Sequence, residues 1–185
     1  RLSFYQEHLW QSLIRGTLTD QQRIELAQLM PSECPGMALI MSSDHHPSSW
    51  MEMLSVIGQC ISFQDAANAR VVTFIWLNRY YAAKPSETVS RISRIFEEWK
   101  SKHSIITVLG ASKHRVNLTA ELVEAYREAE LALQHSFYMP EAAILWGTDV
   151  KPFVNKPTFN PIEISEQLIL AIKAEDRYRM SAHVN

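Results

Sequence analysis

Residues 105–137 read IITVLGASKHRVNLTAELVEAYREAELALQHSF and predict a strand, a polar turn and a long helix in succession. The first part is an apolar run rich in β-branched residues that ends in Gly110-Ala111-Ser112. Beyond the turn, apolar residues recur every three or four positions, which is the spacing of one helix face. They are Leu118, Leu122, Ala125, Tyr126, Ala129, Leu133 and Phe137. The segment therefore predicts a helix that packs one face on a protein core.

Shorter segments on both sides supply the other predicted elements. Strands are predicted at residues 37–41, 62–65, 70–77 and 142–146, and residues 66–69 are the turn of a hairpin. Helices are predicted over residues 50–61 and from 85 to about 101, the latter with Glu87–Arg91 and Arg94–Glu98 ion pairs at four-residue spacing. This order predicts an α+β fold of the ferredoxin-like kind, an antiparallel sheet with helices on one face.

Further helices flank this unit and divide the chain into three parts. Residues 1–30 are predicted to form N-terminal connector helices, the second with Ile24, Ala27 and Leu29 buried. Residues 31–150 are the α+β domain. Residues 151–185 begin as a linker with two prolines and continue into a helix that starts at Asn160-Pro161.

The first helix has an unusually broad apolar face, formed by Leu2, Tyr5, Leu9, Trp10, Leu13 and Ile14. Large apolar groups left in water mark contact sites. Self-association through Tyr5, Leu9, Trp10 and Leu13 is one expectation, with Tyr5 and Trp10 as anchors. The alternative is that the domain's own core absorbs the whole face.

Composition limits the classes of function. A formal net charge of -2 provides no basic field for nucleic acid, so the chain itself is not expected to bind DNA. Cys34 and Cys60 lack metal-site spacing and are interpreted as reduced thiols. The loop residues Asp44, His45 and His46 and the basic turn 113–115 are interpreted as solvated, although a turn before a helix is also a place for an anion. No cofactor and no metal are expected.

The helix also carries a short motif. Residues 125–133, Ala-Tyr-Arg-Glu-Ala-Glu-Leu-Ala-Leu, resemble the Ser-Tyr-x-Glu-Ala-x-x-Ala-Leu element in the central region of YesN-type response regulators, with Ala125 in place of the usual Ser. The matching residues include Tyr126, Glu128, Ala129 and Leu133. Such regulators are bacterial two-component proteins with an N-terminal receiver and a C-terminal AraC-type helix-turn-helix module.

The resemblance implies a degenerate nucleotide-cyclase or GGDEF-like domain. An active cyclase of that kind would carry Gly-Gly-Asp/Glu-Glu-Phe in the hairpin, where this chain has Ala66-Ala67-Asn68-Ala69. The implied function is a non-enzymatic, cytoplasmic coupling module without membrane contact. It would be homodimeric and would connect a receiver before Arg1 to a DNA-binding module after Asn185. A domain that senses a small ligand or nucleotide, and an active cyclase, are the alternatives.

Overall fold

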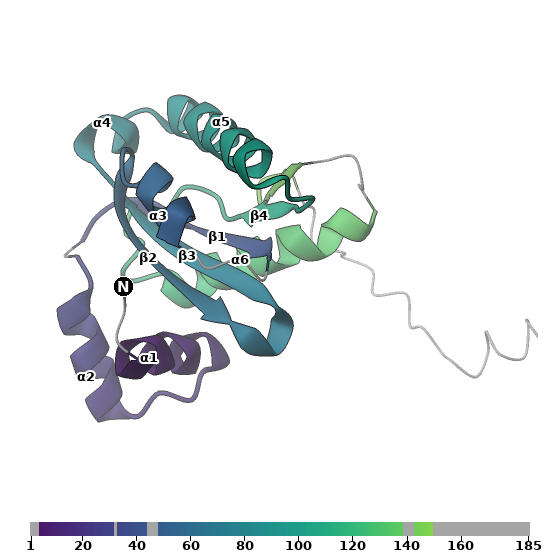
Figure 1. The fold of residues 1–185 in the computed structure, drawn as a ribbon. Coiled ribbons are helices and arrows are strands. Elements are labelled where there is room, and N and C mark those ends of the chain that lie inside the picture. The colour runs from purple at the N-terminus through teal and green to yellow at the C-terminus, as the bar shows by residue number, and fades with distance from the viewer. Residues whose placement is uncertain (1–3, 32, 44–47, 139–142, 150–185) are drawn as a thin grey trace, which may run out of the picture. The chain divides into compact units, whose positions relative to one another are not determined.

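In a computed structural model, which describes residues 4–31, 33–43, 48–138 and 143–149, a sheet of five strands forms the centre of the fold (Figure 1). The strands are β1 (Gly36–Ser42), β2 (Gly58–Asp65), β3 (Arg70–Leu77), β4 (Leu109–Ala111) and β5 (Ile144–Trp146). Their order across the sheet is β2-β3-β1-β4-β5. β3 pairs antiparallel with β1 and β2, β1 also pairs antiparallel with β4, and β5 lies parallel to β4.

The first four strands have the predicted ferredoxin-like arrangement. The helix α3 (Ser48–Leu54) connects β1 to β2, and α5 (Pro85–His103) lies between β3 and β4. A 3-10 turn, η1 (Ala66–Asn68), closes the β2–β3 hairpin, and a short helix, α4 (Arg79–Ala82), precedes α5. The α+β class and the largely antiparallel sheet are therefore confirmed, with β5 added in parallel at one edge.

Helices cover both faces of the sheet, whereas the sequence predicted helices on one face. Figure 1 shows α4 and α5 on one side and α1 (Phe4–Arg15) and α2 (Asp20–Leu29) on the other, together with α6 (Leu122–Gln134), which continues into η2 (His135–Phe137). The physical reason lies in the strands. In β1, Met37, Leu39 and Met41 pack against the α3–α5 layer, while Ala38 and Ile40 pack against the α1–α6 layer. Strands that are apolar at consecutive positions need a cover on each face.

The predicted helix over residues 50–61 is wrong beyond Leu54. Residues 58–65 pair with β3 along its whole length, from Gly58 opposite Leu77 to Asp65 opposite Arg70. Ile57 and Ile61 are buried in the structure, so their helical spacing was a poor guide to the element that contains them. Cross-strand pairing with a mostly apolar neighbour overrides a short helical pattern.

The N-terminal helices are part of the same compact unit as the sheet, Arg1–Val150. The prediction for the second helix was wrong in detail, because Leu26 is buried whereas Ile24 is 58% exposed and Ala27 is also exposed. α2 has a capping box, in which Thr19 and Gln22 bond each other's backbone N–H groups, and it presents only a narrow stripe to the core. The expectations for Leu2, residues 44–46, residue 142, the Phe137 side chain and residues 151–185 lie outside the described part of the chain.

Candidate functional site

The β2–β3 hairpin is the place where a nucleotide cyclase of this topology would hold its substrate. The turn contains Ala69 in the left-handed region, with φ at 49°. The Asn68 side-chain amide donates to Asp65 Oδ2 at 2.6 Å, and Arg15 Nη2 of α1 lies 3.6 Å from Asp65 Oδ1. The Asp65 side chain is only 3% exposed. This carboxylate is therefore directed inward. Among the described residues its Oδ1 atom has no hydrogen bond, and the longer contact with Arg15 is its link to the end of α1.

Tyr126 and Glu130 connect the same hairpin to α6. Arg70, the first residue of β3, donates through Nη1 to Glu130 Oε1 at 2.8 Å, and the Tyr126 hydroxyl donates to the same oxygen at 3.3 Å. Tyr126 is 7% exposed. Its burial, together with the nearby Glu130 carboxylate, raises the pKa of Tyr126 to about 12. The motif tyrosine is thus a core residue whose hydroxyl has a partner within the protein.

Glu128 binds the basic turn, residues 113–115, that precedes α6. Arg115 donates through Nη2 to Glu128 Oε2 at 2.6 Å and through Nη1 to Glu121 Oε2 at 2.8 Å. The Lys113 backbone N–H also donates to Glu128 Oε2, at 3.3 Å. The Arg115 side chain is 12% exposed, so the interpretation of this turn as solvated was wrong for Arg115. Burial lowers the pKa of the neighbouring His114. The carboxylates of Glu121, which precedes α6, and of Glu128 within α6 bind the guanidinium that an external anion would need.

Ala129 and Leu133 are packing residues at the crossing of α6 and β4. Both are buried. A Cβ atom added to Gly110 of β4 would lie 2.3 Å from the Ala129 carbonyl oxygen and 2.6 Å from the Leu133 nitrogen. Gly110 therefore permits a backbone approach that no other residue allows. The four motif residues position α6 on the sheet.

The first helix is largely absorbed by the domain's own core. Leu9 and Trp10 are 1% and 0% exposed. The Trp10 ring packs against Phe63, Phe74 and Trp76, at centroid distances of 6.3, 5.5 and 6.3 Å. The self-association role predicted for Leu9 and Trp10 is therefore incompatible with this fold, because the sheet face beneath α1 is apolar and needs the same side chains.

Two other residues of that helix keep contact with the surface. Tyr5 is 53% exposed and its hydroxyl donates to Glu25 of α2. Leu13 packs partly against the core and lines a groove of about 400 Å³ between α1, α2 and the start of α6. Of the predicted contact residues, Tyr5 and Leu13 remain within reach of a partner.

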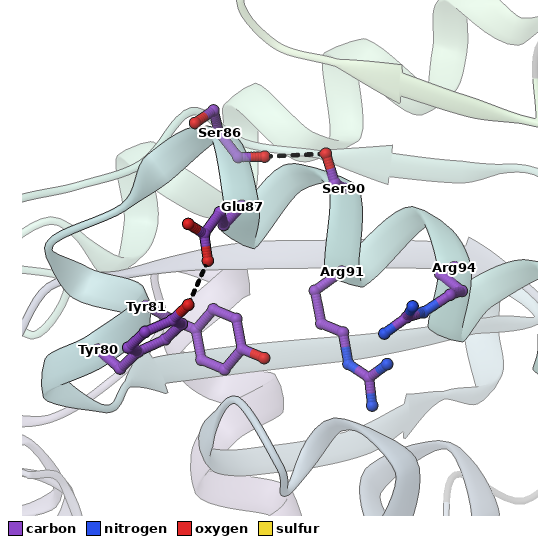
Figure 2. A pocket seen from close by; sticks show the side chains of 7 residues that line it. All are labelled: Tyr80, Tyr81, Ser86, Glu87, Ser90, Arg91 and Arg94. Carbon is purple, nitrogen blue, oxygen red and sulfur yellow. Dashed lines mark hydrogen bonds between the residues drawn. The ribbon is translucent and has the colours of Figure 1, made fainter.

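A second groove was not anticipated from the sequence. It has a volume of about 520 Å³ and lies on α4 and α5 (Figure 2). Its lining residues are Tyr80, Tyr81, Ser86, Glu87, Ser90, Arg91 and Arg94. Paired tyrosines followed by two arginines three residues apart on a helix are the signal that could have indicated it.

Comparison of the chain with protein-family models, with curated proteins and with solved structures finds no match. Each helix in the described part is too short or too polar to cross a lipid bilayer.

Proposed function

We propose that this chain is a non-enzymatic signal-coupling module, the central region of a YesN-type two-component transcription regulator. The ferredoxin-like strand order and the motif on α6 both support this role. The observation that carries the proposal is a continuous set of contacts from α1 through the β2–β3 hairpin to α6. Packed side chains, hydrogen bonds and ion pairs of this kind would carry energetic coupling between the N-terminal input of such a module and its central helix.

The first link joins α1 to β2. Gln11 donates through its side-chain amide to the Gln64 carbonyl at 3.0 Å, and the Gln64 backbone N–H donates to Glu7 Oε1 at 3.2 Å. The Arg15–Asp65 contact continues this line to the hairpin turn. Trp10 is fully buried beneath the helix and stacks on Phe63 of the edge strand β2, so a shift of α1 would disturb the packing of that strand.

The second link joins the hairpin to α6. Asp65 and Arg70 are opposite each other at the end of the β2–β3 pair. Arg70 then bonds Glu130 of α6. A change in the position of α1 therefore reaches α6 through two ion pairs on one hairpin end.

In the proposed mechanism, a receiver before Arg1 biases two arrangements of α1, and α6 transmits the difference toward a DNA-binding module after Asn185. A signal of this kind acts by favouring one of two existing states. The protein is cytoplasmic and homodimeric in this proposal, and it contacts DNA only through the C-terminal module. The Ala66-Ala67-Asn68-Ala69 turn supports a role without turnover, because it lacks the acids and glycines of a cyclase signature.

A double-mutant cycle tests the connection. Arg15→Ala and Glu130→Ala are made singly and together, and the free energy of unfolding is measured in urea. We expect the loss of stability in the double variant to differ from the sum of the two single losses by about 0.5 kcal/mol or more. This value is the lower end of the range of interaction energies for residues in one network. Glu98→Ala replaces Arg15→Ala in the matched control, and that cycle should be additive. Additivity in both cycles would contradict the energetic connection between α1 and α6 on which the proposal depends.

Two further measurements address the role itself. GTP and Mg²⁺ are incubated with the chain, and no cyclic dinucleotide or hydrolysis product is expected. Turnover that disappears in Asp44→Ala would make the protein an enzyme. The encoded sequence on either side is expected to contain a receiver and a helix-turn-helix pair, and their absence would refute the transcription role.

A further inference from the structure

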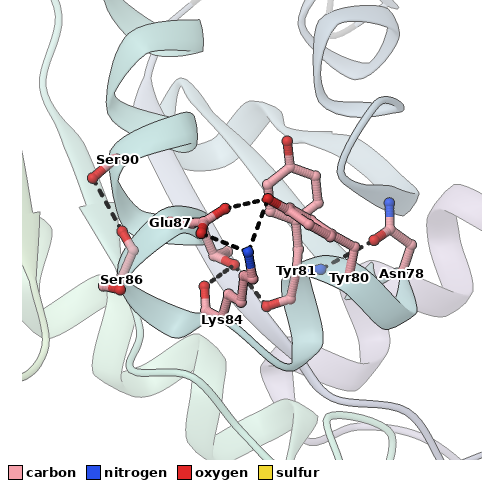
Figure 3. Close-up of polar contacts among 8 residues, drawn as sticks. Asn78, Tyr80, Tyr81, Lys84, Ser86, Glu87 and Ser90 are labelled. Atoms are coloured by element: carbon pink, nitrogen blue, oxygen red, sulfur yellow. Dashed lines mark hydrogen bonds and ion pairs between the residues drawn. The ribbon is translucent and has the colours of Figure 1, made fainter.

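The groove on α4 and α5 contains an ion pair that differs from the one predicted. Glu87 accepts from Lys84 Nζ at 2.8 Å and from the Tyr80 hydroxyl at 2.5 Å, and Lys84 Nζ also lies 3.2 Å from that hydroxyl (Figure 3). The Lys84 ammonium lies over the Tyr80 ring, 4.4 Å from its centroid. These bonds lower the pKa of Glu87 and raise that of Lys84. Glu87 is thus engaged on the side of the groove away from Arg91.

Arg91 is consequently left without the carboxylate that its spacing predicts. Within the described residues its guanidinium has no ion pair and no hydrogen bond. Arg94, one turn further along α5, has only a long contact with Glu98, 3.9 Å between two exposed side chains. Figure 2 shows both guanidinium groups on the same side of α5, with the Tyr81 ring beside Arg91. Two like charges one turn apart repel each other, and an anion between them would relieve the repulsion.

We propose that the α4–α5 groove binds a small anion that carries a pyrophosphate group. Guanidinium groups present planar forks of N–H donors that match phosphate oxygens. The Ser86 and Tyr81 hydroxyls at the groove wall add neutral donors. A volume of about 520 Å³ is in the range of small-molecule sites, roughly 300–1,000 Å³. This groove begins just after the C-terminal end of β3, at the opposite end of that strand from the hairpin turn. The proposal does not depend on the coupling role.

The aromatic side chains can distinguish the two classes of ligand that carry a pyrophosphate group, a nucleoside diphosphate and inorganic pyrophosphate. Tyr80 and Tyr81 meet edge to face, with ring centroids 5.1 Å apart, and form a wall beside the arginines. A nucleoside diphosphate could stack its base on this wall, whereas inorganic pyrophosphate would use the arginines alone. Both ligands would therefore bind the two arginines through their pyrophosphate group, and only the nucleotide would also contact the Tyr81 ring.

Calorimetry with pyrophosphate and with ADP, at low ionic strength and without metal, tests the site. We expect Arg91→Gln with Arg94→Gln to weaken binding of either probe at least about tenfold, because each removes charge-assisted bonds. Lys102→Gln with Lys113→Gln is the matched control: it removes the same charge from exposed positions outside the groove and should change the affinity less than about twofold. Thermal unfolding verifies that all variants are folded.

A variant with the opposite sign sharpens the test. Glu87→Gln removes the groove's carboxylate and releases Lys84, so binding should become tighter by about threefold. If Tyr81→Ala weakens ADP but not pyrophosphate, the site takes a nucleotide, and if both are unaffected, it takes the anion alone. Absence of binding for both probes at millimolar concentration, or equal affinity in the arginine double variant, would overturn the proposal.

Discussion

At the scale of single residues, Gly110 sets the distance between α6 and the sheet. A methyl group at this position would meet the Ala129 carbonyl oxygen and the Leu133 nitrogen, which are backbone atoms that cannot rotate away. Gly110→Ala should therefore destabilise the fold by about 3 kcal/mol, at the upper end for overpacking. Urea unfolding followed by tryptophan fluorescence measures the change.

Gly16 is the natural comparison for that variant. It has φ at 70° and nothing within 4 Å of an added Cβ. Gly16→Ala should cost only about 1 kcal/mol, from backbone strain alone. A loss at Gly110 that does not exceed the loss at Gly16 would show that α6 can move off β4 without penalty.

Tyr126 makes a prediction about alkaline pH. Its pKa in the folded protein is about 12, above the ordinary value of 10.0. The unfolded chain therefore loses this proton first, and the stability contributed by Tyr126 is complete below pH 10 and is lost as the pH rises toward 12. The loss is at most about 2.7 kcal/mol, or 1.36 kcal/mol per pH unit. Urea unfolding at pH 9, 10 and 11 measures the slope.

Tyr126→Phe provides the control for this slope. The variant should be less stable than the unmodified chain near pH 7, by about 1 kcal/mol for the lost bond to Glu130, and should show a shallower decline above pH 10. Burial also raises the pKa of Cys60 to about 12, so a remaining decline is expected in both proteins. Equal slopes would place the Tyr126 hydroxyl in contact with water.

At the scale of elements, the start of α6 is held by an arginine with two carboxylates. Glu128→Ala should cost about 2 kcal/mol, because Arg115 is 12% exposed and loses a charge-assisted bond in a largely dry site. Glu130→Ala should cost only about 1 kcal/mol, because Arg70 and Glu130 are 21% and 30% exposed. Chemical denaturation of both variants and of Glu121→Ala ranks the three carboxylates.

A larger cost for Glu130 than for Glu128 would reverse this ranking. It would place the main attachment of α6 at the hairpin instead of at the turn 113–115. That result would strengthen the contact path from α1 to α6 and weaken the view that Glu128 is the principal anchor.

At the scale of the whole molecule, self-association has to use side chains that the core leaves outside. Phe4 and Ile24 are 88% and 58% exposed, and the Tyr5–Glu25 bond brings the start of α1 beside α2. We expect the chain to dimerise through this region in sedimentation experiments. Phe4→Glu with Ile24→Glu should weaken the dimer at least about tenfold and leave the fold intact, because both side chains are exposed.

Two outcomes would contradict that prediction. One is an unmodified chain that sediments as a monomer at high concentration. The other is a folded dimer that persists in the double variant. Leu9→Glu is unsuitable for this purpose, because it would place a charge in the core and unfold the domain.

Much of the fold follows from local patterns in the sequence. β3 was predicted to the residue, because RVVTFIWL is an uninterrupted β-branched and aromatic run with a turn on its N-terminal side. α5 was predicted within two residues of its C-terminal end, since Pro85 starts it and the apolar spacing continues through Trp99. Most of the predicted core face of α6 is also confirmed, although Leu118 is buried before the helix begins at Leu122 and the buried Ala132 was not predicted. Each of these signals is contained in one segment.

The remainder depended on contacts between segments. The sequence alone determined the α+β class, the order of strands and helices along the chain, and the apolar face of each long helix. It could do so because periodicity and turn chemistry are local properties. The tertiary structure alone decided that α1 is core, that residues 58–65 are strand, and that Glu87 pairs with Lys84 and leaves Arg91 open. The physical reason is competition: a side chain or backbone group with two possible partners takes the one that folding brings close, and spacing along the chain does not contain that distance.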